Sequence, residues 1–365
     1  MKISSPESYL NYALLFIRGM RQRHYWTKLM RQNLRNIVGE RDLNKAQIQE
    51  IHDLYKGIPH FSMVFHQFYT NATGNFHADY MPDALYYQYI DPFFNDWEMA
   101  KYIDHKGLYR LMFPNAKQPK LLAYKMNGFW FDDAGCMMDF SEALSCIQSV
   151  KTCFIKQAVD SEGGHGIVFV DNSIVSNIEL ETTLFNLSFD VVVQEGLSQS
   201  KTLASINSSS VNTIRLLTLL RRDGTVKIYS VILRMGIGGA RVDNASSGGI
   251  TVGVEDDGRL KSCAYSSKGE RFDRHPTSLV RFDDFVIPNF EIVKQTVIDQ
   301  AKNFPHFRLV SWDIALDDTD QPVVIEANLK FGEIDFHQLN NGSLFGDDTK
   351  DILDEVFTEY RKKDK

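Results

Sequence analysis

Two acidic residues and an asparagine in the last quarter of the chain have the types and spacing of a cation site. Asp313 lies in one apolar run, Glu326 and Asn328 lie in the next, and an acidic turn at 317–321 joins the runs. A hairpin centred between residues 319 and 320 places Asp313 opposite Glu326, with Asn328 two residues along on the same face. Adjacent carboxylates repel unless a cation lies between them, and carboxylate and amide oxygens suit Mg²⁺. The segment predicts a Mg²⁺ site that bridges phosphates; the alternative is a solvated acidic hairpin.

The opposite face of this hairpin is expected to join the core. Alternation along the two strands assigns to it six apolar residues: Trp312, Ile314, Leu316, Val323, Ile325 and Ala327.

A lysine and a glycine-rich loop form a second candidate site. Lys156 lies in a strand-like run, and Gly163, Gly164 and Gly166 follow before the next run. A lysine ammonium suits phosphate oxygens, and the backbone N–H groups of such a loop can cradle them. An ordinary glycine-rich turn is the alternative. The chain contains no GxxxxGK[ST] loop, and the segment 236–241 is not a dinucleotide fingerprint.

Charge is unevenly distributed along the 365 residues. The whole chain carries −7, whereas residues 18–41 hold seven basic side chains against one acid. Apolar residues recur there at helical spacing, which predicts a basic amphipathic helix. One interpretation is a solvated helix face; the other is contact with an anionic surface, either a lipid-linked phosphate, an acidic glycan or a membrane. The acidic total argues against a nucleic-acid partner.

The pattern of apolar runs changes along the chain. Residues 1–103 are expected to be mainly helical, with an aromatic-rich stretch at 61–97. Short strand-length runs then dominate, and a polar turn near Gly196 suggests a boundary. We therefore expect a helical region at 1–103, a first α+β unit at 104–195, and a second at 196–365 that closes with a helix.

Composition places the chain among ordinary globular proteins. Hydrophobic residues make up 43% and charged residues 24%. The four cysteines lack CxxC spacing, so we expect reduced and mostly buried thiols. No apolar stretch reaches about 20 residues and no secretory signal is evident. A cytoplasmic protein is expected, with peripheral contact to the inner face of the membrane as its extension.

The order of these features resembles the ATP-grasp superfamily of carboxylate–amine ligases. The resemblance covers about residues 104–346: a strand lysine, a glycine loop, VVVQEGL, an arginine strand, and then D…E-x-N. The segments SVNTIR, RMGIGGARVDNASSGGITVGV, SWDIAL and IEANLKFGEIDFHQ resemble more specifically the sugar-transfer-associated ATP-grasp group, which is related to α-L-glutamate ligases. This resemblance implies an α+β fold in which two subdomains sandwich ATP.

The resemblance also implies roles for single residues. Lys156 and the three glycines match the phosphate-binding groups, and either Lys106 or Arg110 matches a second nucleotide-binding cation. Gln194, Glu195 and Leu197 match the adenine hinge, and Asp313, Glu326 and Asn328 match the Mg²⁺ ligands. The remaining matches concern catalysis and the acceptor substrate: Arg215, Arg234, Arg241 and Asn244 near the transferring phosphate, and Asp335 and Gln338 near the acceptor.

The implied function is an ADP-forming ligase that uses ATP and Mg²⁺ and passes through an acyl phosphate. Its expected partners are a carboxylate, such as a sugar acid or glycan, and an amine, in polysaccharide or capsule biosynthesis. The reverse assignment, an amino-acid carboxylate joined to an amino sugar, is equally compatible. Two alternatives remain: a phosphotransferase that acts on a sugar hydroxyl, and a non-catalytic nucleotide-binding module.

Overall fold

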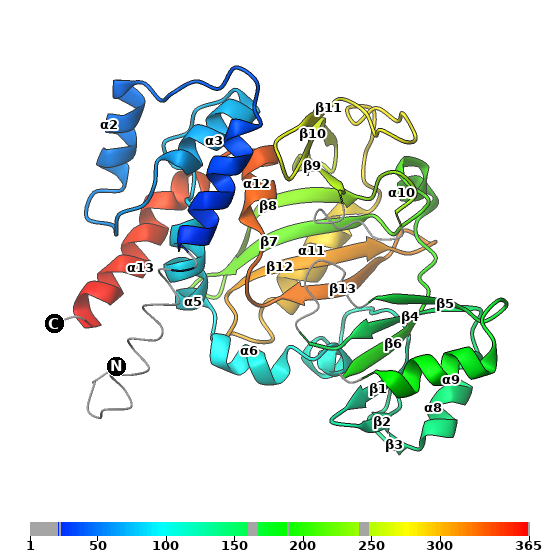
Figure 1. Ribbon diagram of the computed structural model, residues 1–365. Helices are drawn as coiled ribbons and strands as arrows, with labels where there is room; N and C mark the ends of the chain where they lie inside the picture. Colours follow the sequence, from blue (N-terminus) through cyan, green and yellow to red (C-terminus); the bar gives the residue numbers. More distant parts are fainter. Residues whose placement is uncertain (1–20, 22, 160–166, 188–189, 241–247, 364–365) are drawn as a thin grey trace.

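Helices and two antiparallel sheets make up the fold. The computed structural model describes residues 21, 23–159, 167–187, 190–240 and 248–363. Figure 1 shows the N-terminal helices beside a large sheet, with a smaller sheet below it. The predicted α+β class is confirmed. The predicted unit boundaries, at 103/104 and 195/196, stay predictions.

The N-terminal region is helical, as its apolar spacing predicts. Trp26, Met30 and Leu34 recur every four residues in a helix over residues 23–35, and Met30 and Leu34 are buried. The further helices are α2 (Lys45–Leu54), α3 (Val64–Thr73), α4 (Asp83–Leu85), η1 (Tyr86–Ile90), α5 (Asp91–Phe94), α6 (Trp97–Ile103), η2 (Lys106–Leu108) and α7 (Tyr109–Met112).

The smaller sheet has six strands in the order β3-β2-β1-β6-β4-β5. Helices α8 (Phe140–Gln148) and α9 (Asn177–Asn186) accompany it, and a capping box between Asp139 and Glu142 begins α8. The strands are β1 (Leu121–Met126), β2 (Phe129–Phe131), β3 (Met137–Met138), β4 (Thr152–Gln157), β5 (Val168–Asp171) and β6 (Val191–Glu195).

The larger sheet has seven strands in the order β11-β10-β9-β8-β7-β12-β13. The strands are β7 (Thr213–Leu220), β8 (Val226–Met235), β9 (Ile250–Val254), β10 (Leu260–Ser266), β11 (Arg271–Phe272), β12 (Leu309–Leu316) and β13 (Pro322–Asn328). Its helices are α10 (Lys201–Ile206), α11 (Phe290–Gln300), α12 (Ile334–Asn341), the short η5 (Gly346–Asp348) and α13 (Thr349–Lys363).

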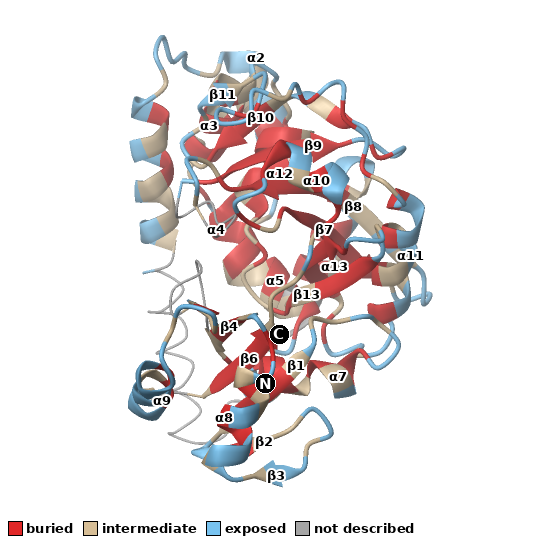
Figure 2. Cartoon of the chain, turned by 90° about the vertical axis from the view of Figure 1, so that its right-hand side faces the viewer, coloured by how far each residue is buried: buried red, intermediate tan, exposed pale blue. Residues whose placement is uncertain are grey.

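Both faces of the larger sheet are covered. One face packs on α11, and the other packs on the N-terminal helices together with α12 and α13. Every residue of β7 and β12 is buried as a result, and the larger sheet is mostly red in Figure 2. This explains why both strands are nearly continuous apolar runs, and it makes the charged residues within them exceptional.

A bulge changes part of the predicted hairpin register. Asp313 lies opposite Glu326 and Ser311 opposite Asn328, as predicted, but the register shifts by one residue beyond Asp313. Ile314 therefore lies opposite Val324. Val324 packs in the hydrophobic core, where the sequence had placed Val323 and Ile325. Ile325 is the extra residue and lines a cavity instead. The predicted apolar face is thus wrong at Val323 and Ile325.

Two other expectations concern the thiols and the membrane. All four cysteines are free, but only Cys153 is buried and Cys136 is exposed, so the expectation of mostly buried thiols is wrong. Within the described residues, no helix has both the length and the apolar character needed to cross a bilayer.

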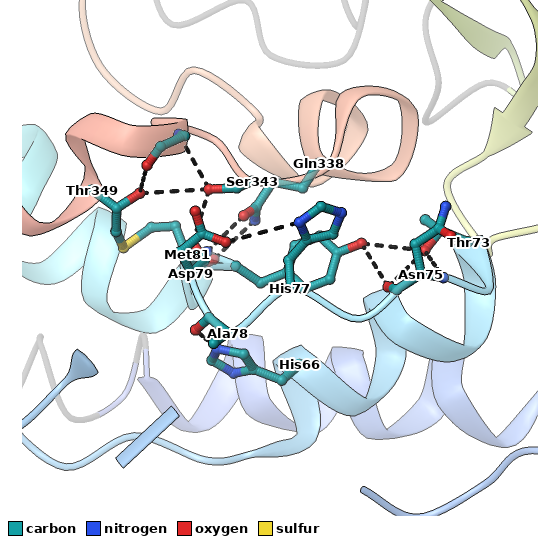
Figure 3. Close-up of polar contacts among 12 residues, drawn as sticks. His66, Thr73, Asn75, His77, Ala78, Asp79, Met81, Gln338, Ser343 and Thr349 are labelled. Carbon is teal, nitrogen blue, oxygen red and sulfur yellow. Dashed lines mark hydrogen bonds and ion pairs between the residues drawn. The ribbon is translucent and has the colours of Figure 1, made fainter. Parts of the chain in front are cut away.

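A buried amide joins the N-terminal region to α12. Gln338 is fully buried; its Oε1 accepts from the Met81 N–H at 2.6 Å and its Nε2 donates to the Met81 carbonyl at 2.9 Å (Figure 3). Nearby, Ser343 donates to the Asp79 carbonyl at 3.2 Å. These contacts bridge residues more than 250 positions apart, and they hold the segment around Met81 against α12 and the residues that follow it.

We predict that Gln338→Ala lowers the free energy of unfolding by about 3 kcal/mol, because two buried backbone groups lose their partners and a void is left. Urea unfolding of wild type and variant measures the difference. Gln49→Ala is the matched control, since Gln49 is exposed and bonds only locally to Asp53. Equal stability of the Gln338→Ala variant and wild type would contradict this structural role.

Candidate active site

A cavity of about 860 Å³ lies between the two sheets and reaches the N-terminal helix over residues 23–35. It collects most of the side chains that the sequence nominates. Those that line it are Lys106, Lys156, Gln194, Glu195, Leu197, Arg215, Arg234, Asp313, Glu326 and Asn328.

The charged floor of the cavity is a row across three adjacent strands. Arg215 of β7 lies directly opposite Asp313 of β12, which lies directly opposite Glu326 of β13. Directly opposed residues share one face of a sheet, so their charged groups meet. Arg234 of β8 lies opposite Thr213, two residues before Arg215, and joins the same face.

Asp313 is held by two arginines inside the protein. Arg215 donates to its carboxylate through Nε and Nη2, both at 2.7 Å, and Arg234 donates through Nη1 at 3.0 Å. All three side chains are 6% exposed or less. Burial alone raises the pKa of a carboxyl, but the charges of Arg215 and Arg234 outweigh it and hold the pKa of Asp313 well below its usual range. The two guanidinium groups therefore favour the ionised form of Asp313.

Glu326 and Asn328 present oxygens to the cavity. Lys106 Nζ lies 2.9 Å from Glu326 Oε1, and Glu326 is 28% exposed. Asn328 Nδ2 donates to the Ser311 carbonyl at 3.0 Å, which fixes the amide so that its Oδ1 is the end left for a cation. Both fit the hard oxygen set that Mg²⁺ takes.

Asp313 fits a metal less well than its two neighbours do. Both of its oxygens already accept from guanidinium groups, and the repulsion between Asp313 and Glu326 is offset here by Arg215, Arg234 and Lys106. Within the described residues, no group of three or more His, Cys, Asp or Glu side chains is placed to hold a metal. A Mg²⁺ site here therefore depends on Glu326, the Asn328 amide and ligand oxygens, with Asp313 beside them.

The other end of the cavity combines a lysine with the hinge strand. Lys156 of β4 donates to Gln194 Oε1 of β6 at 3.0 Å, and Glu195 pairs with Lys120 at 3.1 Å. Apolar surface comes from Leu197, Phe154 and Phe169, and the centroids of the two phenylalanine rings are 5.2 Å apart. A flat base with polar edges suits this combination of apolar walls and amide groups.

The structure distinguishes between the two candidate cations at 104–110. Lys106 lines the cavity and contacts Glu326, whereas Arg110 does not line it. The Arg110 side chain extends toward Gly135, at the far edge of the smaller sheet. Position therefore favours Lys106.

Asp335 and Gln338 are not among the cavity-lining residues, so their contact with the acceptor stays a prediction. Gln338 holds the Met81 backbone. Asp335 lies near the buried Asp83, whose Oδ2 accepts from Tyr69 at 3.0 Å. Burial raises the pKa of both carboxyls; the charge of Asp335 raises the pKa of Asp83 further, and the charge of Glu333 raises that of Asp335. The pair belongs to the packing beneath the cavity.

Five of the nominated residues lie outside the described residues, so their roles stay predictions. They are Gly163, Gly164, Gly166, Arg241 and Asn244.

The turn after β13 contributes a carboxylate that sequence reasoning missed. Glu333 pairs with Arg215 through Nη1, lines the cavity and is 41% exposed. Phe331 and Glu333 both have positive φ, 57° and 52°, a strained backbone for residues with side chains. Gly332 lies between them because a Cβ there would stand 2.6 Å from Ser311 Oγ. The FGE sequence at 331–333, three residues after Asn328, was the available signal.

A residue of the N-terminal region holds this strained turn. The buried Asp91 accepts from the Phe331 N–H at 2.8 Å and from Asn95 Nδ2 at 2.6 Å. Burial raises the pKa of Asp91 to about 6 despite these hydrogen bonds. The helical region thus positions part of the cavity wall.

The basic segment forms the predicted amphipathic helix over residues 23–35. Its apolar side packs on the body of the protein, and Arg23 donates to Gln88 at 2.9 Å and to Tyr89 at 3.3 Å. The outward basic residues are exposed: Arg21, Lys28, Arg31 and Arg35. Contact with an anionic surface stays a prediction.

The chain matches the family described as Sugar-transfer associated ATP-grasp over residues 87–352, more than half of its length. This match confirms the resemblance drawn from the sequence. No curated protein matches the chain.

Several solved structures show a distant likeness. The biotin carboxylase domain of 2-oxoglutarate carboxylase from Hydrogenobacter thermophilus, in complex with MgADP, has 13% identity and a TM-score of 0.43 over 72% of this chain and 47% of that chain. The ATP-grasp ligase PsnB with its minimal precursor has 13% identity and a TM-score of 0.41 over 73% and 64%. The D-alanine–D-alanine ligase from Coxiella burnetii has 10% identity and a TM-score of 0.40 over 71% and 60%.

In each case this chain spans less than two thirds of the length of the solved chain. The predicted cofactors, ATP and Mg²⁺, agree with the ATP-grasp family to which the chain belongs.

We predict that Lys106→Met weakens the binding of MgATP by about tenfold, because a cation in the cavity is lost at a cost of about 1.4 kcal/mol. Arg110→Met is the matched control and should bind MgATP as the wild type does. Isothermal titration calorimetry gives both dissociation constants. A larger loss in the Arg110 variant would reverse the assignment.

We predict a pH effect from the acid pair. Because folding raises the pKa of Asp83 to about 8, the folded state binds the extra proton and loses stability as pH rises from about 4 to about 8. In Asp83→Asn this loss shrinks, so the variant gains stability relative to wild type at the upper end of the window. Burial lowers the pKa values of His66 and His337, so these residues also change the stability at acidic pH. They do so equally in wild type and variant, and their effect drops out of the difference between the two proteins. Urea unfolding at several pH values measures this; parallel profiles would contradict it.

Proposed function

The chain belongs to the sugar-transfer-associated ATP-grasp family, and on that premise we propose that it is an ADP-forming carboxylate–amine ligase that acts on a sugar acid or glycan. The observation that carries the proposal is the row Arg215–Asp313–Glu326, with Lys106 and Lys156 in the same cavity. This places fixed cations beside carboxylate and amide oxygens, which is the charge pattern that phosphoryl transfer needs. Polysaccharide or capsule synthesis on the cytoplasmic side of a membrane is the proposed setting.

The nucleotide is assigned to the end of the cavity between β4, β6 and β13. Adenine would lie against Gln194, Glu195 and Leu197, and Lys156 and Lys106 would bind the phosphates, together with the glycine loop at 163–166. Glu326 and Asn328 would hold Mg²⁺, which neutralises charge on the phosphate oxygens when bound. In the structure Lys156 contacts Gln194 at 3.0 Å, so ATP would take over part of that hydrogen bond.

The carboxylate substrate is assigned to the arginines. Arg215 and Arg234 are fixed by Asp313, and a planar guanidinium suits a carboxylate or an acyl phosphate. The Nη1 group of Arg215 now bonds to Glu333, a half-exposed carboxylate. We infer that Glu333 occupies the direction from which a substrate carboxylate approaches.

The proposed reaction has two steps. A carboxylate oxygen of the substrate attacks the γ-phosphorus of ATP, ADP leaves, and an acyl phosphate forms. The amine nitrogen then attacks the acyl carbon, inorganic phosphate leaves, and the nitrogen loses a proton. Glu333 is the half-exposed carboxylate beside Arg215, so it can accept a proton from the ammonium form of the amine and give the neutral nucleophile; the proton that the nitrogen loses after the attack leaves with the phosphate.

The product distinguishes a ligase from a phosphotransferase. We predict that ADP formation yields free phosphate only when a carboxylate and an amine are both present, because the amine displaces phosphate from the intermediate. Coupled assays of ADP and phosphate, with glucuronate as the carboxylate and a panel of amino acids as amines, measure this. ADP that forms without free phosphate would support a phosphotransferase, and no turnover with any panel member, despite MgATP binding, would support a binding module.

We predict that Glu326→Gln and Lys156→Ala each lower turnover by at least a hundredfold while the fold survives. Each change removes about 3 kcal/mol of stabilisation from developing charge. Glu98→Gln is the matched control, because Glu98 is exposed and pairs only with Lys101. Steady-state ADP formation and circular dichroism give the comparison. Normal rates in a folded Glu326→Gln protein would remove that carboxylate from the reaction.

A further inference from the structure

One end of the cavity is aromatic and has no role in the proposed reaction. Tyr25 and Trp26 of the helix over residues 23–35, Tyr87 of η1 and Phe331 of the turn after β13 line it. Tyr25 is 59% exposed, whereas Tyr87 beside it is buried. An aromatic ring this exposed is unusual in the wall of a cavity. Apolar ring surface that lines a cavity gains free energy when a ligand covers it.

This aromatic end is built by contacts within the protein. The rings of Trp26 and Tyr87 are stacked, with centroids 4.6 Å apart and planes at 25°, and Tyr25 meets Trp26 edge-on at 5.2 Å. The Tyr87 and Phe331 rings are 5.7 Å apart. Arg23 and the buried Met30 hold the helix in place, so the two aromatic residues that it contributes are positioned before any ligand arrives.

The aromatic end continues directly from the charged row. Arg215 joins Asp313 to Glu333, and the N–H of the next residue, Ile334, donates to the Tyr87 hydroxyl at 3.4 Å. A ligand whose carboxylate or acyl group lies at Arg215 therefore has its adjoining part at Tyr87. The nucleotide is assigned to the opposite direction, toward Lys156 and Gln194.

The chemistry of this end selects a class of ligand. Aromatic faces carry partial negative charge, and the C–H hydrogens on the flatter face of a pyranose carry partial positive charge, so the two attract. Hydroxyl groups at the ring edge can bond to Glu333 and Lys330, which also line the cavity.

We propose that Tyr25, Trp26, Tyr87 and Phe331 form a subsite that binds a pyranose ring of the acceptor substrate. The assignment of that ring to the acceptor rests on the proposed function; the binding of a sugar ring does not. The N-terminal helix then takes part in substrate selection through Tyr25 and Trp26.

Saturation-transfer NMR tests the subsite without any need for turnover. The probes are sodium D-glucuronate, uncharged methyl α-D-glucopyranoside and benzyl alcohol, each titrated into full-length protein saturated with MgADP. The variants are Tyr25→Ala and Trp26→Leu. Tyr102→Ala is the matched control, since Tyr102 is 79% exposed and is not a cavity-lining residue.

The expected result is saturation of the sugar ring protons in wild type and in Tyr102→Ala, with apparent Kd raised about threefold to tenfold in Tyr25→Ala and in Trp26→Leu. The MgADP affinity should be equal in all four proteins. Absence of ring-proton saturation, equal sugar affinity in Tyr25→Ala, or saturation of benzyl alcohol alone overturns the proposal. Because Tyr25 is exposed, its variant decides the outcome even if Trp26→Leu fails to fold.

The two proposals fail in different ways. If wild type does not bind MgADP, the proposed function fails, and the sugar titration without nucleotide still decides the subsite. If MgADP binds and neither sugar does, the subsite fails and the nucleotide site stands.

Discussion

The buried carboxylate of Asp313 is the charge on which the arrangement of the cavity depends. Taking an anion out of water costs several kcal/mol unless paired charges and hydrogen bonds replace the lost hydration. Arg215 and Arg234 supply both, through three hydrogen bonds of 2.7 to 3.0 Å. In return the carboxylate keeps two guanidinium groups in place on a sheet whose central strands are otherwise apolar. Removal of Asp313, or of both arginines, would leave a buried charge without its partner.

The other charged residues of the cavity are arranged around Asp313. Glu326 is next to Asp313 across the sheet, and Lys106, which is 8% exposed, compensates its charge. Glu333 meets Arg215 from a strained turn, and Asp91 of the N-terminal region holds that turn. Charges that are fixed before the substrate binds need no reorganisation during a reaction. The N-terminal helices are therefore part of the site, since they supply both a support for the turn and an aromatic wall.

The sequence predicts local pairing well and contacts between distant segments poorly. The positions of Asp313 opposite Glu326 and of Ser311 opposite Asn328 follow from the hairpin turn alone, because register is set by the turn and by alternation. The bulge that moves Ile325 to the cavity depends on packing beyond the hairpin, so alternation could not show it. The family resemblance places Gln338 near the acceptor, whereas its hydrogen-bond partner in the structure is Met81, which is 257 positions away. Tyr25 and Trp26 join the cavity only because their helix docks on η1, which periodicity could not reveal.

The central claim is that the cavity beside Asp313 is a metal–nucleotide site. The most direct measurement is a crystal structure of the full-length protein with Mn²⁺ and a non-hydrolysable ATP analogue, with anomalous scattering used to locate the metal. The account predicts an anomalous peak bonded to the oxygens of Glu326 and Asn328, with the phosphates at Lys106 and Lys156 and the base against Gln194. A nucleotide bound outside this cavity, or a metal bound away from Glu326 and Asn328, would contradict it.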